Sequence, residues 1–147
     1  SLWNAEIDEN LSPTSGAIEL LSAAAMTDIK IALVTSGERP YADQVMTELG
    51  ISALFDAIVT FEAVAHPKPT PDAYLLACER LSVAPAQAVG FEDSASGFKS
   101  LTAAGIESVA IGHELADCPA GCAARSHHMD FTTIRLDEFV DDERSAR

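Results

Sequence analysis

The chain has 147 residues, of which 48% are apolar, and this composition favours a folded domain with a sizeable core. Its formal net charge of −14 argues against nucleic acids and anionic membranes as partners, because nothing neutralises phosphates in bulk. No apolar run is long enough to span a bilayer, and no stretch has the layout of a signal peptide. We therefore expect a soluble cytoplasmic protein, and the low cysteine count is typical of a reducing compartment.

Apolar periodicity predicts strands that alternate with helices along most of the chain. This alternation indicates an α/β fold with a doubly wound, mainly parallel sheet and helices on both faces. The expected elements, in order, are a helix capped by Thr14 or Ser15 and ending near 25, a strand over 29–34, a helix over 40–49, a strand over 57–61, a helix begun by Thr70-Pro71-Asp72, a strand over 88–92, a helix from 98 to 104, a strand over 108–112, an irregular stretch over 113–129, an edge strand over 131–136 and a helical turn over 136–140.

Two of the strand ends carry residues that suit an anion. The strand over 29–34 is followed by Thr35-Ser36-Gly37, where hydroxyl groups and backbone N–H groups can approach a phosphate. An ordinary strand-to-helix turn explains the same residues. Further on, Lys68 stands between two prolines that hold it in a stiff, extended segment, and a fixed ammonium suits a phosphoryl oxygen or a carboxylate. The alternative is a surface lysine in a rigid loop.

The third strand end delivers two adjacent carboxylates, Glu92 and Asp93, into a loop from which a helix leaves. In open α/β sheets, ligands bind beyond the carboxyl ends of strands, and two carboxylates there favour a cation between them. Oxygen ligands of this kind suit Mg²⁺, so the pair predicts a magnesium site. A solvated acidic turn that caps the next helix is the alternative.

These three strand ends, in this order, resemble the second, third and fourth signature motifs of the haloacid dehalogenase-like hydrolase superfamily. They are most similar to its β-phosphoglucomutase-like and sugar-phosphate phosphatase branch. The resemblance implies a Rossmann-like core and an Mg²⁺-dependent phosphatase or phosphomutase that acts on a small phosphorylated metabolite. It implies that Thr35, with Ser36 and Gly37, holds the transferring phosphoryl group and that Lys68 neutralises its charge. It further implies that Asp93 holds the metal directly and that Glu92 ligates or supports it.

The first motif of that superfamily, an Asp-x-Asp on the first strand, has no counterpart, because no two aspartates stand two residues apart. The resemblance therefore implies that the nucleophile, the general acid–base and a metal ligand are missing, and we expect the chain alone to be inactive. It also implies a division into a cap remnant or connector at 1–12, the C-terminal part of the core at 13–140 and a tail at 141–147.

The missing first strand would lie between the strands that end at Thr35 and Glu92, and unpaired apolar edges are prone to association. We therefore expect that these two strands pair directly, or that another chain fills the gap in a homodimer or strand-swapped oligomer.

Other functions remain open from the sequence. A non-catalytic remnant that binds a small ligand or a partner is the main alternative, and a dehalogenase of small halo-acids is a minor one. A receiver domain is disfavoured because no strand offers an acceptor aspartate. A zinc site is conceivable around Cys118 and Cys122 with His113, His127 and His128, although their spacing matches no common signature.

Overall fold

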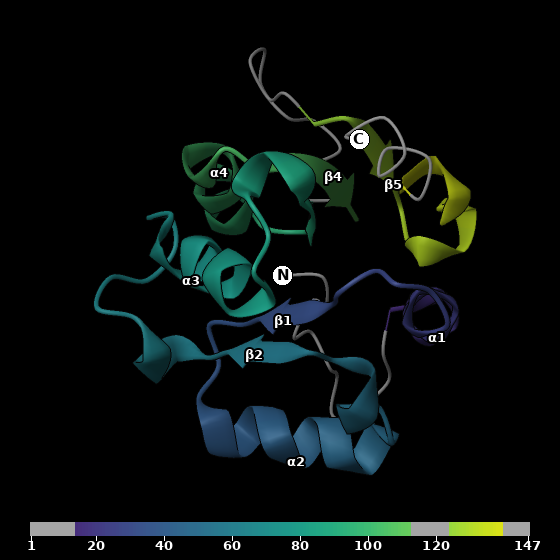
Figure 1. Ribbon diagram of the computed structural model, residues 1–147, viewed down its shortest axis with the longest axis horizontal. Helices are drawn as coiled ribbons and strands as arrows, with labels where there is room; N and C mark the ends of the chain where they lie inside the picture. The colour runs from purple at the N-terminus through teal and green to yellow at the C-terminus, as the bar shows by residue number, and fades with distance from the viewer. Residues whose placement is uncertain (1–13, 113–123, 140–147) are drawn as a thin grey trace.

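The structure is a computed structural model that describes residues 14–112 and 124–139. Helices and short strands alternate along the chain, as Figure 1 shows. The elements are α1 (Ala17–Ala25), β1 (Ala32–Val34), α2 (Arg39–Leu49), β2 (Ala57–Val59), α3 (Asp72–Leu81), β3 (Val89–Glu92), α4 (Ala95–Ala104), β4 (Glu107–Ile111) and β5 (Ser126–His128). The expected α/β class is confirmed, because every strand pairing is parallel.

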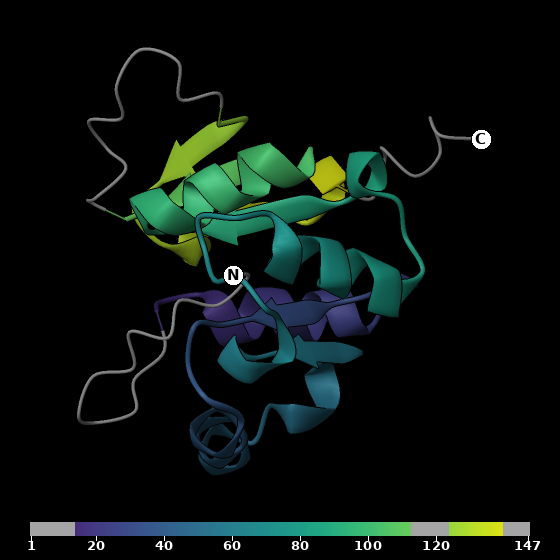
Figure 2. The same cartoon turned by 90° about the vertical axis from the view of Figure 1, so that its left-hand side faces the viewer.

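The strands form two separate half-sheets. β1 pairs with β2, with Val34 opposite Val59, while β3, β4 and β5 pair in that order. In Figure 2 the half-sheet of β3 to β5, in green and yellow, lies above the half-sheet of β1 and β2, in purple and blue. The strand order places β1 and β3 as the two inner edges. Of the two alternatives expected for these strands, direct pairing is wrong, because β1 pairs with β2 and β3 pairs with β4.

Helices cover both faces of β1 to β4, which explains why the sequences of these strands are mostly apolar, whereas β5 is polar. On one face, α1 and α2 pack with Leu33, Phe91 and Val109 in one buried cluster. On the other face, α3 and α4 pack with Val34 and Val59 in a second cluster. Successive residues of β1 thus point into different clusters, as the two-residue period of a strand requires.

Most helix boundaries agree with the sequence, and the exceptions have local causes. α2 and α4 end at Gly50 and Gly105, which adopt positive φ angles of 67° and 75°. α1 is preceded by Gly16 rather than by a hydroxyl cap. Thr70 does not cap α3 either, because its hydroxyl donates to the carbonyl oxygens of His66 and Pro67 within the loop.

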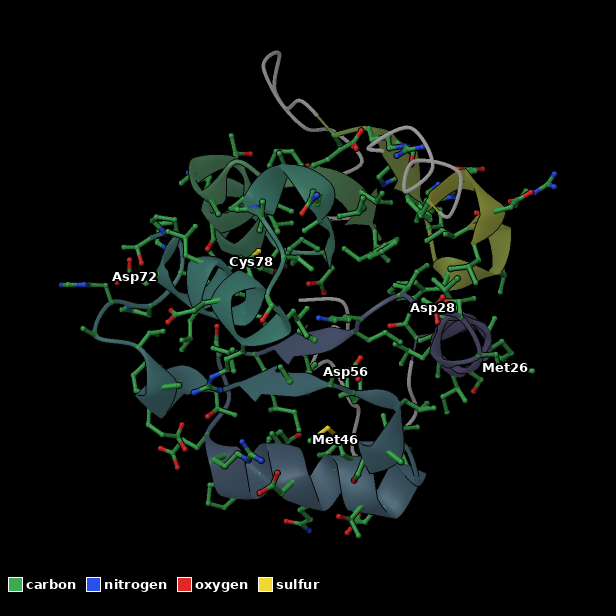
Figure 3. The ribbon with its side chains drawn as sticks, in the orientation of Figure 1. Met26, Asp28, Met46, Asp56, Asp72 and Cys78 are labelled. Carbon is green, nitrogen blue, oxygen red and sulfur yellow. The ribbon has the colours of Figure 1, made fainter. Side chains whose placement is uncertain are left out.

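Several strands are shorter than expected or lie elsewhere. β1 begins at Ala32 because the N–H of Ile31, just before it, donates to the Asp56 carboxylate at 2.8 Å. Figure 3 shows Asp56 at the end of the β1–β2 pair. β5 falls within the stretch expected to be irregular. The edge strand expected over 131–136 is wrong, because the carboxylate of Asp130 accepts the N–H of Thr132 and starts a short 3-10 helix. The expected helical turn near the end is present at 137–139.

Some expectations lie outside the described residues: the cap remnant at 1–12, the tail at 141–147, and the cysteines of the zinc hypothesis. None of the helices in the described ranges combines the length and apolar character needed to cross a membrane.

Candidate functional site

Lys68 brings the three predicted strand ends together. It lies in the loop after β2, and its ammonium nitrogen Nζ is 2.6 Å from Oε1 of Glu92, at the end of β3. The same nitrogen is 3.5 Å from the carbonyl oxygen of Val34, at the end of β1. Since Val34 precedes Thr35 and Glu92 precedes Asp93, a hydroxyl, an ammonium and two carboxylates gather at the carboxyl ends of β1 and β3.

Glu92 is the buried centre of this cluster, with 2% of its surface exposed. Its Oε1 accepts from Lys68 and from the hydroxyl of Tyr74, and the Ser94 hydroxyl lies 3.4 Å from its Oε2. Burial acts to raise the pKa of the Glu92 carboxyl, but the surrounding positive charges, Lys68 among them, lower it more. The pKa of Glu92 therefore lies below its ordinary value, and the group is ionised at neutral pH.

Gly97 allows the Glu92 carboxylate to lie against α4. A Cβ atom at Gly97 would stand 2.1 Å from the Glu92 side-chain carboxyl carbon, which is far inside van der Waals contact. The neighbouring Ser94 hydroxyl accepts the N–H of Gly97 at 3.1 Å and caps the helix. The small residues after Glu92 and Asp93 therefore position the helix as well as the carboxylate.

Tyr74, on α3, is a site residue that the sequence analysis did not single out. It is 5% exposed, its hydroxyl donates to Glu92, and the Lys68 ammonium lies 5.0 Å from its ring centroid. The hydroxyl of a buried tyrosine usually has a hydrogen-bond partner, so a tyrosine on the buried face of a helix could have indicated a polar contact here. Tyr74 thus contacts both members of the ion pair.

Thr35 is buried, and its hydroxyl oxygen accepts the N–H of Gly37 at 3.0 Å. Because the oxygen already accepts this bond, the hydroxyl hydrogen can be donated to a further acceptor. The backbone N–H of Thr35 is used by the carbonyl of Val59. Of the three residues Thr35, Ser36 and Gly37, Ser36 is the exposed one.

The metal prediction rests on Asp93 and Glu92, which have different surroundings. Oε1 of Glu92 already contacts the Lys68 ammonium. A metal ion bound at the same oxygen would be repelled by that positive charge. Asp93 is half-buried and presents the kind of carboxylate oxygen that Mg²⁺ prefers. Across residues 14–112 and 124–139 there is no group of three or more metal-ligating side chains. The arrangement fits an ion that takes most of its ligands from water and substrate, as Mg²⁺ commonly does.

The two histidines of the zinc hypothesis that the structure describes have other partners. His127 Nε2 lies 2.8 Å from the carbonyl oxygen of Gly112, and His128 Nδ1 lies 2.6 Å from the hydroxyl of Thr133. These contacts link β5 to Gly112, just after β4, and to Thr133, in the segment after β5.

Comparison with known proteins agrees with this arrangement. Residues 1–111 match the family model described as haloacid dehalogenase-like hydrolase. Hexitol phosphatase A of Escherichia coli is 40% identical over 132 residues, which cover 90% of this chain and 58% of that protein. Validoxylamine A 7'-phosphate phosphatase of Streptomyces hygroscopicus is 40% identical over 96 residues, which cover 65% of this chain and 45% of that protein.

Among solved structures, a putative β-phosphoglucomutase from Thermotoga maritima superimposes with a TM-score of 0.72 and 31% identity, covering 92% of this chain and 61% of that one. The chain spans about half the length of the curated relatives that it matches. The family match covers most of the sequence and includes all three strand ends that meet at Lys68. The chain therefore belongs to the haloacid dehalogenase-like hydrolases, in the branch of sugar-phosphate phosphatases and β-phosphoglucomutase-like proteins.

Proposed function

We propose that this chain is the C-terminal part of an Mg²⁺-dependent phosphatase or phosphomutase that acts on a small phosphorylated sugar or polyol. The observation that carries the proposal is the Lys68 ammonium, which touches the strand ends that bear Thr35 and Asp93. The names of the relatives support the substrate class, since they describe phosphatases of hexitols and of other phosphorylated carbohydrates.

The chemistry of the cluster suits phosphoryl transfer, in which catalysis is mostly positioning and charge stabilisation. The Thr35 hydroxyl and the N–H group of Ser36 would hold the phosphoryl oxygens, while the N–H of Gly37 holds the Thr35 hydroxyl oxygen in place. Lys68, oriented by Glu92, would neutralise the charge that develops on them. Asp93 would hold Mg²⁺, which supplies further charge stabilisation when bound. In this assignment Glu92 supports the site through Lys68.

We further propose that the chain alone does not turn over substrate, because its sequence has no Asp-x-Asp and so lacks the family's nucleophile. A direct test incubates the purified chain with para-nitrophenyl phosphate and Mg²⁺. We expect no release of nitrophenol above that of a no-protein blank. Robust turnover by the pure chain would refute the inactivity.

Phosphate and metal binding test the site itself without requiring turnover. We expect a titration with inorganic phosphate and Mg²⁺, followed by NMR, to shift the amide signals of Thr35, Gly37 and Asp93. Asp93→Asn should weaken the Mg²⁺-dependent part of the shifts about tenfold, since a metal ligand loses its charge. The matched control is Asp43→Asn, an exposed carboxylate on α2, which should leave the titration unchanged. Equal titrations for both variants would exclude Asp93 as the metal ligand.

A further inference from the structure

The start of α2 lies beside the strand end that carries Thr35. The backbone carbonyl of Gly37 accepts the N–H of Phe61 at 3.0 Å, so the segment after β1 is tied to the segment after β2. In Figure 1 the arrows of β1 and β2 point the same way, toward the end of the half-sheet at which α2 begins. Side chains that project from these two segments therefore border the candidate phosphate site.

Two half-exposed aromatic rings lie along this border. The ring of Tyr41 comes within 3.5 Å of the position that a Cβ atom of Gly37 would take, and Phe61 is the residue bonded to the Gly37 carbonyl. The side chains of Tyr41 and Phe61 are 47% and 50% exposed. Such rings offer flat apolar surface against which the C–H groups of a sugar or polyol can pack.

A carboxylate of the chain itself occupies the start of α2. The N–H of Arg39, the first residue of the helix, donates to Oε1 of Glu62 at 2.7 Å. Pro40 has no N–H, and the N–H of Ala42 donates to the carbonyl of Glu38. In other helices the first-turn donors can bind an anion, but these donors of α2 are not available to a ligand.

The charge at this border is negative. The backbone N–H groups of Glu62 itself and of Arg39 hold the pKa of the Glu62 carboxyl below its ordinary value, so the group is ionised at neutral pH. Glu38, just before α2, is exposed and adds a second carboxyl. The Arg39 guanidinium pairs with Asp43, with Nε 2.8 Å from Oδ1, so its charge is balanced locally. A second anion on a bound ligand would therefore be repelled here.

Glu62 lies close enough to the Thr35 hydroxyl for this repulsion to matter. Thr35 Oγ1 accepts the N–H of Gly37, and Glu62 accepts that of Arg39. These two N–H groups belong to residues that are two positions apart, so at most about 7 Å of backbone separates them. At low salt, a carboxylate and a phosphate dianion about 8 Å apart in water repel each other enough to weaken binding about threefold to fivefold.

The site also restricts where the body of a ligand can lie. The Lys68–Glu92 pair and Asp93 lie at the β3 side of a phosphoryl group held at Thr35. The rest of the ligand therefore leaves on the β2 side, past Gly37 and along the two rings. A hydroxyl group on that path can donate to a carboxylate, whereas a second phosphate cannot.

We propose that Glu62, with Tyr41 and Phe61, makes the site selective for sugar or polyol monophosphates and against ligands that carry a second phosphate. This selectivity rests on the proposed function, because it takes the phosphoryl group to be bound by Thr35 and Lys68. Glu62 is in this respect a specificity-determining residue and takes no part in the chemistry.

The test uses the whole chain with Mg²⁺ at low salt and two ligands, fructose 1-phosphate and fructose 1,6-bisphosphate, which differ in the second phosphate. Binding is followed by NMR through the amide signal of Thr35. We expect the bisphosphate to bind about threefold to fivefold more weakly than the monophosphate. Glu62→Gln keeps an oxygen that can accept the Arg39 N–H and removes the charge. It should bring the two dissociation constants close together and leave that of fructose 1-phosphate nearly unchanged.

Glu48→Gln is the matched control, because it removes the same charge from an exposed position of α2 about 14 Å from Arg39, and it should leave the difference between the ligands in place. A wild-type chain that binds the bisphosphate at least as tightly as the monophosphate would overturn the inference while the phosphate site stands. The same holds if Glu62→Gln keeps the full difference. If neither ligand shifts the Thr35 signal, the phosphate site is absent, and the proposed function fails together with the inference.

Discussion

Replacing Lys68 with methionine tests whether the ion pair organises the site. Methionine keeps the length of the aliphatic stem and removes the charge. The side chains of Lys68 and Glu92 are only 9% and 1% exposed, and their charged atoms are 2.6 Å apart. Removing one partner of such a pair strands a buried charge, which costs about 3–5 kcal/mol of folding stability. We expect Lys68→Met to lower the free energy of unfolding at pH 7 by about this amount.

The pH dependence of this loss follows from the pKa of Glu92. In the wild-type protein this pKa is lowered, so the ion pair stabilises the fold above the ordinary glutamate value of 4.5 and loses that contribution as the pH falls through the folded-state pKa. In Lys68→Met the burial of Glu92 is opposed by less positive charge, so its pKa rises. Protonation at low pH then relieves the buried charge, and the difference between variant and wild type should shrink on acidification.

Urea denaturation from pH 4 to pH 8 measures both effects, and two further variants complete the experiment. Lys99→Met, at an exposed position of α4, should stay within about 0.5 kcal/mol of the wild type. Adding Glu92→Gln to Lys68→Met removes the stranded charge and should restore much of the lost stability. If Lys68→Met costs no more than the Lys99 control at pH 7, the ion pair does not hold the site and the reasoning is refuted.

Two other substitutions test the surroundings of Glu92, again by urea denaturation. Tyr74→Phe keeps the ring but deletes a hydrogen bond to a buried carboxylate, so it should cost about 1.5–3 kcal/mol, whereas the exposed Tyr41→Phe should be neutral within about 0.5 kcal/mol. Gly97→Ala should favour the helix by about 1 kcal/mol, but its methyl group would overlap Glu92, so we expect a net loss of about 1–3 kcal/mol. Ser96→Ala, at an exposed position in the same turn, is the matched control, and a stabilised Gly97→Ala would show that Glu92 lies elsewhere.

The alternation of apolar strands and helices was readable from the sequence because local patterns decide it. The helix stops at Gly50 and Gly105 and the cap at Ser94 are local signals of the same kind. The convergence of Lys68 with the ends of two strands also followed, since parallel strands present their carboxyl ends at one edge. The roles of Thr35, Lys68 and Asp93 in binding phosphate or metal stay predictions.

What the sequence could not predict depends on tertiary contacts. Glu92 was expected to ligate or support the metal beside Asp93, and its contacts with Lys68 and Tyr74 were not predicted, because they come from a loop and a helix that sequence spacing does not relate. β5 was missed because its residues show no apolar alternation, and among the described residues β4 is its only strand neighbour. The sequence left open whether β1 and β3 pair directly, because local patterns do not report which strands are neighbours, and the structure excludes that pairing.

The Lys68–Glu92 contact crosses from the part of the chain that holds β1 and β2 to the part that holds β3, β4 and β5. The same two side chains thus link the two half-sheets by an ion pair and form the charged centre of the cluster. A mutational screen that measures only the loss of ligand binding would not distinguish a variant of Lys68 or Glu92 that is destabilised from one that no longer binds the ligand. Every such variant therefore needs its own unfolding curve before a role in the chemistry is assigned to it.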